Sequence, residues 1–391
     1  MTNVSGGDFV TLETTGATVG LSNRASALLG RARSGAPFAR PGRHFSGNPL
    51  RISDLELFLV QAPRGGEWPP VRALLVRLKT ESGCLGWGEG QVAWRAEELG
   101  GRREMLLAAL AGRAVHDLAE LPALDCLAAP FLRSAVEMAC WDALARDAGQ
   151  PLCNLLGGCF RRRIPLAVRL PEMPALTAGH HARELAERGF HTQIITASGN
   201  AVRDAELVQA VREGAGDGVE LRLDAGGKFT MPAARDLCAR LGRDGVRFVL
   251  DPLSGGMERT AALRRQVETP LAVAAGISSP ADVLAAVRTG AADFVRIEPG
   301  RVGGIGPSRA CAEIATAGGI GAILGSPPSL GIATAAMLHL AAAVPAFSSG
   351  NECAYHQLAE DVLAQPLTLV EGQLNVPLAA GLGVEVAGIG D

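Results

Sequence analysis

Apolar and polar positions alternate in short runs along this chain, and each run is followed by a longer segment with apolar residues every three or four positions. The series starts with IPLAVRL at 164–170 and ends with ATAAMLHLAAAV at 333–344. The first pattern is typical of strands and the second of amphipathic helices. Seven strand-plus-helix units can be counted, and they predict a parallel sheet. Right-handed crossovers in so long a series predict a closed α/β barrel.

A different pattern precedes the barrel. LRISDLELFLV at 50–60 and VRALLVRLKTESGCLGWGE at 71–89 predict antiparallel strands, and the loop QAPRGGEWPP between them would cover a pocket. A helix is expected at 131–149. We therefore expect four parts: a loosely ordered extension or subunit arm at 1–47, an α+β capping domain at 48–160, a barrel at 161–350, and a segment at 351–391 that returns to the capping domain.

The segment VELRLDAGGKF at 219–229 is the candidate for chemistry, because an alternating run ends in Asp224 and then breaks into glycines. In an α/β barrel the residues at the carboxyl ends of the strands build the active site. The alternative is that Asp224 caps the next helix. Lys228, four residues further on, is either a displaced general acid or base or a solvated loop lysine.

Composition narrows the function classes. The 391 residues carry 37 basic and 40 acidic side chains, a net charge of −3 without long single-sign runs, so neither nucleic acid nor a membrane surface is an expected partner. The eight cysteines form no CxxC pair, and we see neither a leader peptide nor an apolar run long enough to span a membrane. These features predict a cytoplasmic protein with reduced thiols.

Several motifs in the same order and spacing resemble the enolase superfamily, in particular the branch of muconate lactonising enzyme, o-succinylbenzoate synthase and N-acylamino acid racemase. The motifs are GCLGWGE at 83–89, SAVEMACWDALARDAGQPLCNLLGG at 134–158, ELRLDAG at 220–226, EPGRVGGI at 298–305 and AAMLHLAAAVP at 335–345, followed by LAEDVL and GLGVEV near the end. The resemblance implies a modified TIM barrel of seven strand-helix units beneath an α+β capping domain.

The resemblance also implies proton abstraction beside a carboxylate by a lysine or other base, with magnesium on three strand-end carboxylates stabilising the enediolate. This sequence departs from that pattern. Asp224 matches the first ligand, but Leu250 and Ala275 replace the other two, so no cofactor is expected. The slots of the usual pair of lysines hold either Gln193 and Ile195 or Ile194 and Thr196. Where relatives carry a lysine before PGRVGG, this chain has Glu298.

The departures suggest a pocket governed by charged side chains. Alternation would place Arg222 on the same face as Asp224 and Arg296 on the same face as Glu298, so that two arginines would balance two carboxylates. The alternative is a structural ion-pair network. Further residues expected to bind substrate are Asp251, Ser326, Ser329 and Trp68.

Two functions remain open at this point. The first is metal-independent proton transfer by an isomerase, cycloisomerase, epimerase or lyase of the mandelate racemase/muconate lactonising enzyme type, with Asp224 and Glu298 as the acid/base pair. Its partner would be a small-molecule substrate, a carboxylate, and the protein would be a homo-oligomer. The second is an inactive barrel that binds a ligand or partner protein. The barrel mouth is the space at the carboxyl ends of the strands. An open mouth favours the enzyme, and a mouth plugged by Trp68 or Leu250 favours the binding protein.

Overall fold

The computed structural model describes residues 11–13, 18–20, 50–66, 68–242 and 245–389, so most of the expected extension at 1–47 lies outside the described residues. The capping domain is built on a five-stranded antiparallel sheet in the order β2-β1-β3-β4-β5. Its strands are β1 (Thr11–Glu13), β2 (Thr18–Gly20), β3 (Ile52–Ala62), β4 (Val71–Thr80) and β5 (Leu85–Gly90), and its helices are α1 (Leu99–Leu110), α2 (Pro130–Asp147) and α3 (Leu152–Leu155).

Glycines in β5 let α2 lie directly on the sheet. Side chains at Gly86, Gly88 and Gly90 would run into the backbone carbonyls of α2, so only glycine fits on this face of the strand. The alternate residues Trp87 and Glu89 point to the opposite face and are buried. The GWGEG pattern thus places one face of β5 on α2 and directs Glu89 away from it.

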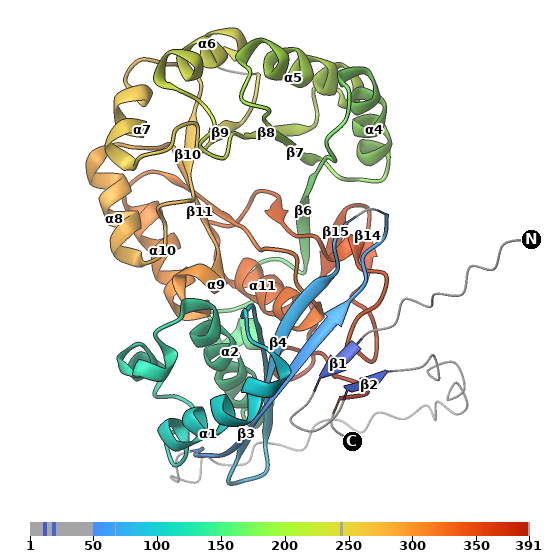
Figure 1. Cartoon of the computed structure of the whole chain (residues 1–391), viewed down its shortest axis with the longest axis vertical. Helices are drawn as coiled ribbons and strands as arrows, with labels where there is room; N and C mark the ends of the chain where they lie inside the picture. Colours follow the sequence, from blue (N-terminus) through green and yellow to red (C-terminus); the bar gives the residue numbers. More distant parts are fainter. Residues whose placement is uncertain (1–10, 14–17, 21–49, 67, 243–244, 390–391) are drawn as a thin grey trace, which may run out of the picture.

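The second part is the predicted barrel, and Figure 1 shows its helices arranged around the outside of the strands. The seven expected strand-plus-helix units are all present. The parallel strands are β6 (Arg163–Arg169), β7 (Thr192–Thr196), β8 (Glu220–Asp224), β9 (Phe248–Leu250), β10 (Leu271–Val273), β11 (Phe294–Ile297) and β12 (Gly321–Leu324), and the helices are α4 (Ala175–Glu187), α5 (Ala201–Ala215), α6 (Met231–Leu241), α7 (Met257–Arg264), α8 (Pro280–Thr289), α9 (Pro299–Val302), α10 (Ile305–Ala317) and α11 (Gly331–Ala343).

An eighth, very short strand completes the ring. Strand β13 (Asn351–Glu352) pairs in parallel with β6, and a parallel bridge joins Glu352 to Gly325 at the end of β12. The two ends of the seven-strand series are therefore connected through β13. Glu352 consequently lies among the strand ends of the barrel.

The lower barrel interior is apolar, with one buried arginine. A small cluster of Phe248, Leu250, Ala272, Ala274 and Ile323 lies in the barrel and extends to the level of Asp224, and Phe294 packs against this cluster. The guanidinium of Arg222 lies 5.4 Å from the ring centroid of Phe248 and binds Glu220 and Ser349.

The C-terminal segment contacts both parts of the molecule. Strand β15 (Gln373–Asn375) pairs antiparallel with β6 and with β14 (Leu369–Val370). Further on, the Leu382 amide donates to Asp142 of α2 at 2.7 Å, and Arg146 donates to the Val384 carbonyl at 2.8 Å. The segment after β15 therefore contacts α2 at these two points.

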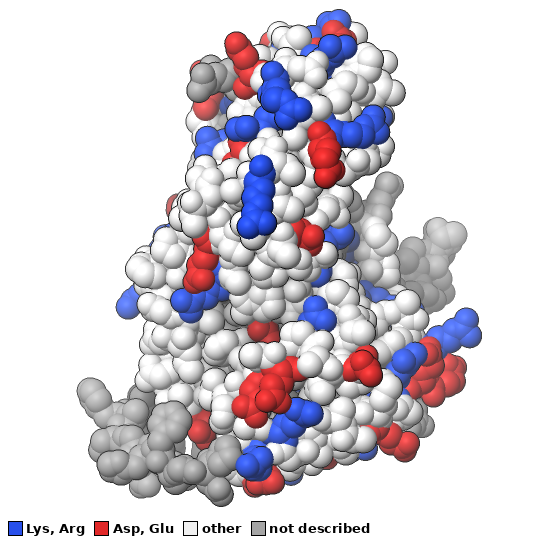
Figure 2. Space-filling model, turned by 90° about the vertical axis from the view of Figure 1, so that its left-hand side faces the viewer, with Lys and Arg blue, Asp and Glu red and all other residues white. Residues whose placement is uncertain are grey.

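The surface and the helices agree with the composition. On the face shown in Figure 2, basic and acidic side chains are interspersed and no single-sign patch forms. Within the described ranges, no helix has the length and apolar character needed to cross a bilayer. All eight cysteines are free thiols.

Candidate active site

Besides Asp251, which directly follows β9, three acidic side chains lie at the carboxyl ends of barrel strands. Asp224 ends β8, Glu298 follows β11, and Glu352 ends β13. Their side chains are 21%, 11% and 9% exposed, so all three are largely withdrawn from solvent but still reached by it. Isolated carboxylates this deep are costly, and cationic partners are expected beside them.

Arg169, the last residue of β6, is the partner of Asp224. Its Nη2 lies 2.7 Å from Asp224 Oδ2, and its Nη1 donates to Thr196 Oγ1 at 2.9 Å. The register pairs Thr196 with Asp224 directly across the β7–β8 ladder. A guanidinium therefore spans three adjacent strand ends, and its geometry is fixed by two hydrogen bonds.

Arg296 of β11 is the second cation of the mouth. Its Nη1 binds Glu352 Oε2 at 2.8 Å, while its Nη2 lies 4.0 Å from Glu298 Oε2. Burial by itself lowers the pKa of Arg296, but the charges of Glu352, Asp224 and Glu298 outweigh it and leave that pKa raised. Arg296 is thus a permanent cation facing several carboxylates.

Glu298 differs from the other acids because no arginine of the described residues lies within hydrogen-bond distance of its carboxylate. Its nearest recorded cationic nitrogens are Arg301 Nε at 3.7 Å and Arg296 Nη2 at 4.0 Å, and both distances exceed a hydrogen bond. Asp224 and Glu352 are each bound by an arginine at hydrogen-bond distance. Among these three strand-end acids, Glu298 is the one that no arginine of the described residues holds at hydrogen-bond distance.

Asp251 has a structural task beside the mouth. Its backbone adopts a φ of 46°, and its carboxylate accepts hydrogen bonds from the amides of Ala274 and Ala275 at 2.9 and 3.1 Å. Burial raises the pKa of Asp251 above its ordinary value, although the two amides and Arg296 act in the opposite direction. Asp251 therefore ties the end of β9 to the end of β10.

Two expected site residues have other partners. Arg222 is buried one layer below Asp224 and pairs with Glu220 at 2.6 Å, so Arg169 and not Arg222 takes the place beside Asp224. Lys228 donates from its Nζ to the Ala197 carbonyl at 2.6 Å in the loop beyond β7.

The loop between β3 and β4, which we call the capping loop, contacts the segment that follows β13. Trp68 stacks with Arg64 at 4.9 Å, and the Gly65 amide donates to the Gln357 carbonyl at 2.7 Å. Trp68 therefore stacks within its own loop, whereas Leu250, which pairs with Asp224 across the β8–β9 ladder, is buried in the apolar cluster of the barrel.

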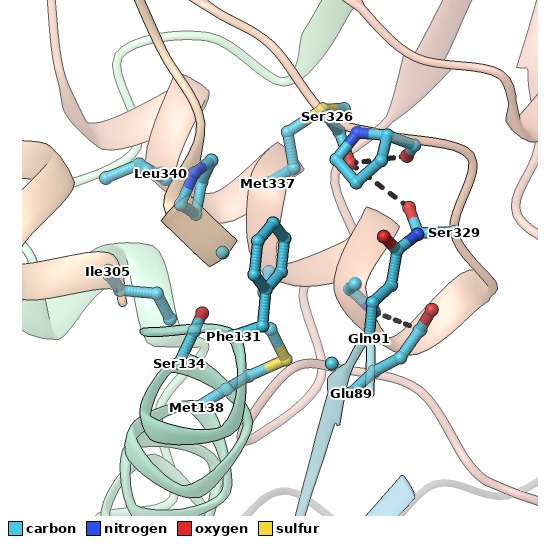
Figure 3. Close-up of a pocket in the computed structure, with 16 residues that line it drawn as sticks. Glu89, Gln91, Phe131, Ser134, Met138, Ile305, Ser326, Ser329, Met337 and Leu340 are labelled. Atoms are coloured by element: carbon cyan, nitrogen blue, oxygen red, sulfur yellow. Dashed lines mark hydrogen bonds between the residues drawn. The ribbon is translucent and has the colours of Figure 1, made fainter. Parts of the chain in front are cut away.

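Ser326 and Ser329 lie beside the mouth. Their hydroxyls are 3.2 Å apart in the loop between β12 and α11, and the Ser326 amide donates to the Glu352 carbonyl at 3.2 Å. They border a cavity of about 50 Å³ between the barrel and the capping domain, which Figure 3 shows. Ser326 and Ser329 therefore lie between the strand ends of the barrel and this cavity.

Comparison with known proteins agrees with this arrangement of capping domain and barrel. Residues 177–388 match the family described as enolase C-terminal domain-like, and residues 70–157 match the N-terminal domain of mandelate racemase/muconate lactonizing enzyme. The chain belongs to the enolase superfamily.

The superfamily relatives include isomerases, racemases, epimerases and a probable glucarate dehydratase. Muconate cycloisomerase 1 of Rhodococcus opacus is 30% identical over 80% of this chain and 88% of its own length, and a hydrophobic dipeptide epimerase of Enterococcus faecalis is 28% identical over 79% and 90%. An isomerase structure from Streptomyces coelicolor superposes with a TM-score of 0.78 at 29% identity and covers 86% of this chain and 96% of its own.

The strand register settles which residues fill the two lysine slots of the superfamily. Ile194 pairs with Arg222 and Thr196 with Asp224, so Ile194 and Thr196 share the inner face with those charged residues. Gln193 instead donates to the Ala182 carbonyl of α4 at 2.8 Å and faces outward. Neither inner side chain is a base.

The superfamily's magnesium ion does not fit these residues. Asp224 is bound by a guanidinium, its neighbour in the β9 register is Leu250, and Ala275 supplies no side-chain oxygen. Magnesium requires several oxygen ligands in near-octahedral geometry. In the part of the chain that the structure describes, no group of three or more His, Cys, Asp or Glu is placed to hold a metal.

Sequence reasoning missed Arg169 and Glu352. The sequence offered a signal for Arg169. It is the last residue but one of the IPLAVRL run, so it lies at the carboxyl end of its strand, as Asp224 does at the end of VELRLD. Glu352 carried no such signal, because a strand of two residues has no measurable alternation.

Proposed function

We propose that this protein catalyses metal-independent proton transfer at the carbon beside a carboxylate, in an isomerisation, cycloisomerisation, epimerisation or elimination of a small organic acid. Glu298 is the general base, because its buried carboxylate lies near Arg296 and Arg301 of the described residues at distances longer than a hydrogen bond. This single feature supports the proposal most strongly. The relatives that carry out isomerisation and epimerisation give the reaction class.

Arg169 and Arg296 take the electrostatic part of the reaction. Loss of the α-proton leaves negative charge on the substrate carboxylate, and two permanent cations at the strand ends stabilise it. Two opposite unit charges 4 Å apart attract by about 4 kcal/mol at an effective dielectric of 20, so two guanidinium groups can lower the activation free energy substantially. Both arginines are held by carboxylates before substrate arrives, which fixes their positions.

Proton balance requires an acid as well as a base. Glu298 takes the proton from carbon and becomes neutral, and the same group returns it in a one-base isomerisation. For inversion or elimination a second group donates a proton from another side, and the candidates are the ammonium group of Lys228 and the protonated form of Asp224. The capping loop that carries Trp68 would then exclude water and select the substrate.

The test is exchange of substrate hydrogen in deuterated buffer containing a chelator. A panel of small carboxylic acids, including N-acyl amino acids and dipeptides, is followed by proton NMR for loss of the α-hydrogen signal. Exchange is expected with the wild type, and Glu298→Gln, which keeps the shape but not the basicity, should lower its rate at least about 100-fold. Glu313→Gln, an exposed glutamate of α10, is the matched control.

Three outcomes would contradict the proposal. Full exchange by Glu298→Gln would remove Glu298 from the role of base. Loss of exchange with the chelator and recovery with magnesium would show that a metal site had been overlooked. Absence of exchange across the whole panel would leave the chain without this activity.

A further inference from the structure

The cavity between the barrel and the capping domain is walled by two helices. Phe131, Ser134 and Met138 line it from α2, at the three-to-four residue spacing of one helix face, and Met337 and Leu340 line it from α11. Figure 3 shows these side chains directed toward one another across the space. We call this space the interdomain chamber.

Polarity changes along the interdomain chamber. Gln91, Ser326 and Ser329 stand at one side, where Gln91 donates to the Pro328 carbonyl at 3.1 Å. The rest of the lining is apolar apart from Ser134 and Glu89, and it includes the methionines, Leu340 and Ile305. Sites that bind small molecules typically combine an apolar lining with a few polar groups that fix orientation.

The chamber shares walls with the mouth. Pro299 and Gly300, which directly follow Glu298, line it, and so does Ser326, whose amide is bonded to the Glu352 carbonyl. A side chain at Gly300 would lie 2.5 Å from the ring of Phe131, so glycine is needed for this wall to approach α2. A ligand held at the strand ends therefore has an adjacent space for a substituent.

We propose that the interdomain chamber receives a compact apolar group of the substrate, so that the preferred substrate is a carboxylic acid with a short or branched hydrocarbon substituent. This inference rests on the proposed function. The cavity volume is about 50 Å³, and a single water needs only about 10–15 Å³ of such volume, so the space suits a compact group of a few carbons. Larger groups require the capping domain to move.

The chamber favours hydrocarbon over a polar group. Its one ionisable wall residue, Glu89, has both carboxylate oxygens occupied by the amides of Leu330 and Ala333 at 2.6 and 2.8 Å. Burial raises the pKa of Glu89 to about 7, which further reduces its value as a partner for a cationic group. A methyl-bearing group instead gains contact with Met138 and Met337, whose thioethers adapt to irregular shapes.

The experiment uses the methionines as reporters. The intact protein is labelled with ¹³C at the methionine methyl groups and titrated with acetate, isobutyrate and phenylacetate. Isobutyrate is expected to shift the Met138 and Met337 resonances, whereas acetate, which has no branch, and phenylacetate, which is too large, leave both in place. Met231 and Met257, at the starts of α6 and α7, are the internal controls. Signals are assigned with single Met→Leu variants.

A substitution that fills the interdomain chamber with a larger side chain tests whether the isobutyrate response arises there. Ala336→Leu places a larger side chain in it and should abolish the isobutyrate response, and Ala333→Val serves if Ala336→Leu does not fold. Equal shifts with acetate and isobutyrate, or none with isobutyrate, would overturn the inference. The readout needs no turnover: shifts without hydrogen exchange would refute the proposed function alone, and exchange without shifts would refute the chamber alone.

Discussion

At the scale of single residues, the barrel mouth depends on which cation accompanies Asp224. Arg169 supplies a planar group with several N–H donors, and two of them are already directed at Asp224 and Thr196. A guanidinium cannot lose its charge, and it binds carboxylates through a pair of parallel hydrogen bonds. Arg169 can therefore hold Asp224 in place and still present donors to a substrate oxyanion.

Replacing Arg169 should separate charge from geometry. Arg169→Met removes the cation and is expected to reduce the rate of α-hydrogen exchange about 100-fold or more, as loss of an oxyanion-stabilising donor does. Arg169→Lys keeps the charge but not the paired donors, so an intermediate rate is expected. Exchange kinetics in deuterated buffer measure both. Arg240→Met on the exposed side of α6 is the control, and equal rates for Arg169→Met and the wild type would contradict the role.

At the scale of elements, the sequence predicted what local patterns determine. The seven strand-plus-helix units follow from alternation and helical spacing, and both are properties of neighbouring residues. Strand β13 was missed because its two residues become a strand only by pairing with β6, far back in the sequence. The pairing of Arg169 with Asp224 likewise joins residues on separate strands, and no local pattern selects Arg169 over Arg222.

Strand β5 and helix α2 give a prediction at this scale. Gly88→Ala would place a methyl group inside the contact distance of the Ala135 carbonyl, so strand and helix must separate. Such overpacking costs about 1–3 kcal/mol or more, and urea denaturation should show the loss. Gly100→Ala in α1 meets no neighbouring atom and should be neutral or stabilising by up to about 1 kcal/mol. Unchanged stability of Gly88→Ala would mean that the two elements are not packed this closely.

At the scale of the whole molecule, two buried glutamates join the capping domain to the barrel. Glu89 of β5 accepts the amides of Leu330 and Ala333 at the start of α11, and Glu137 of α2 accepts those of Ile305 and Gly306 at the start of α10. Figure 1 shows α11 between the barrel strands and the capping domain. Carboxylates at helix N-termini satisfy amides that have no partner within the helix.

Burial of Glu89 and Glu137 makes the free energy of unfolding depend on pH. Burial raises the pKa of both Glu89 and Glu137 to about 7, from 4.5 for an exposed glutamate. Between these values the folded protein binds more protons than the unfolded chain, so the free energy of unfolding must fall as pH rises. The stabilisation is fully present below about pH 4.5 and lost by about pH 7. Each carboxyl contributes on the order of 3 kcal/mol at most.

Glu137→Gln should reveal this contribution. The amide cannot ionise, so the decline in the free energy of unfolding between pH 5 and pH 7 should be shallower than in the wild type, whatever the variant's absolute stability. Denaturant titrations at several pH values measure the slope. Glu313→Gln, which changes an exposed glutamate on the same helix that Glu137 caps, should keep the wild-type slope. Identical slopes for all three proteins would show that Glu137 stays ionised in the folded protein, because the amides of Ile305 and Gly306 then compensate its burial.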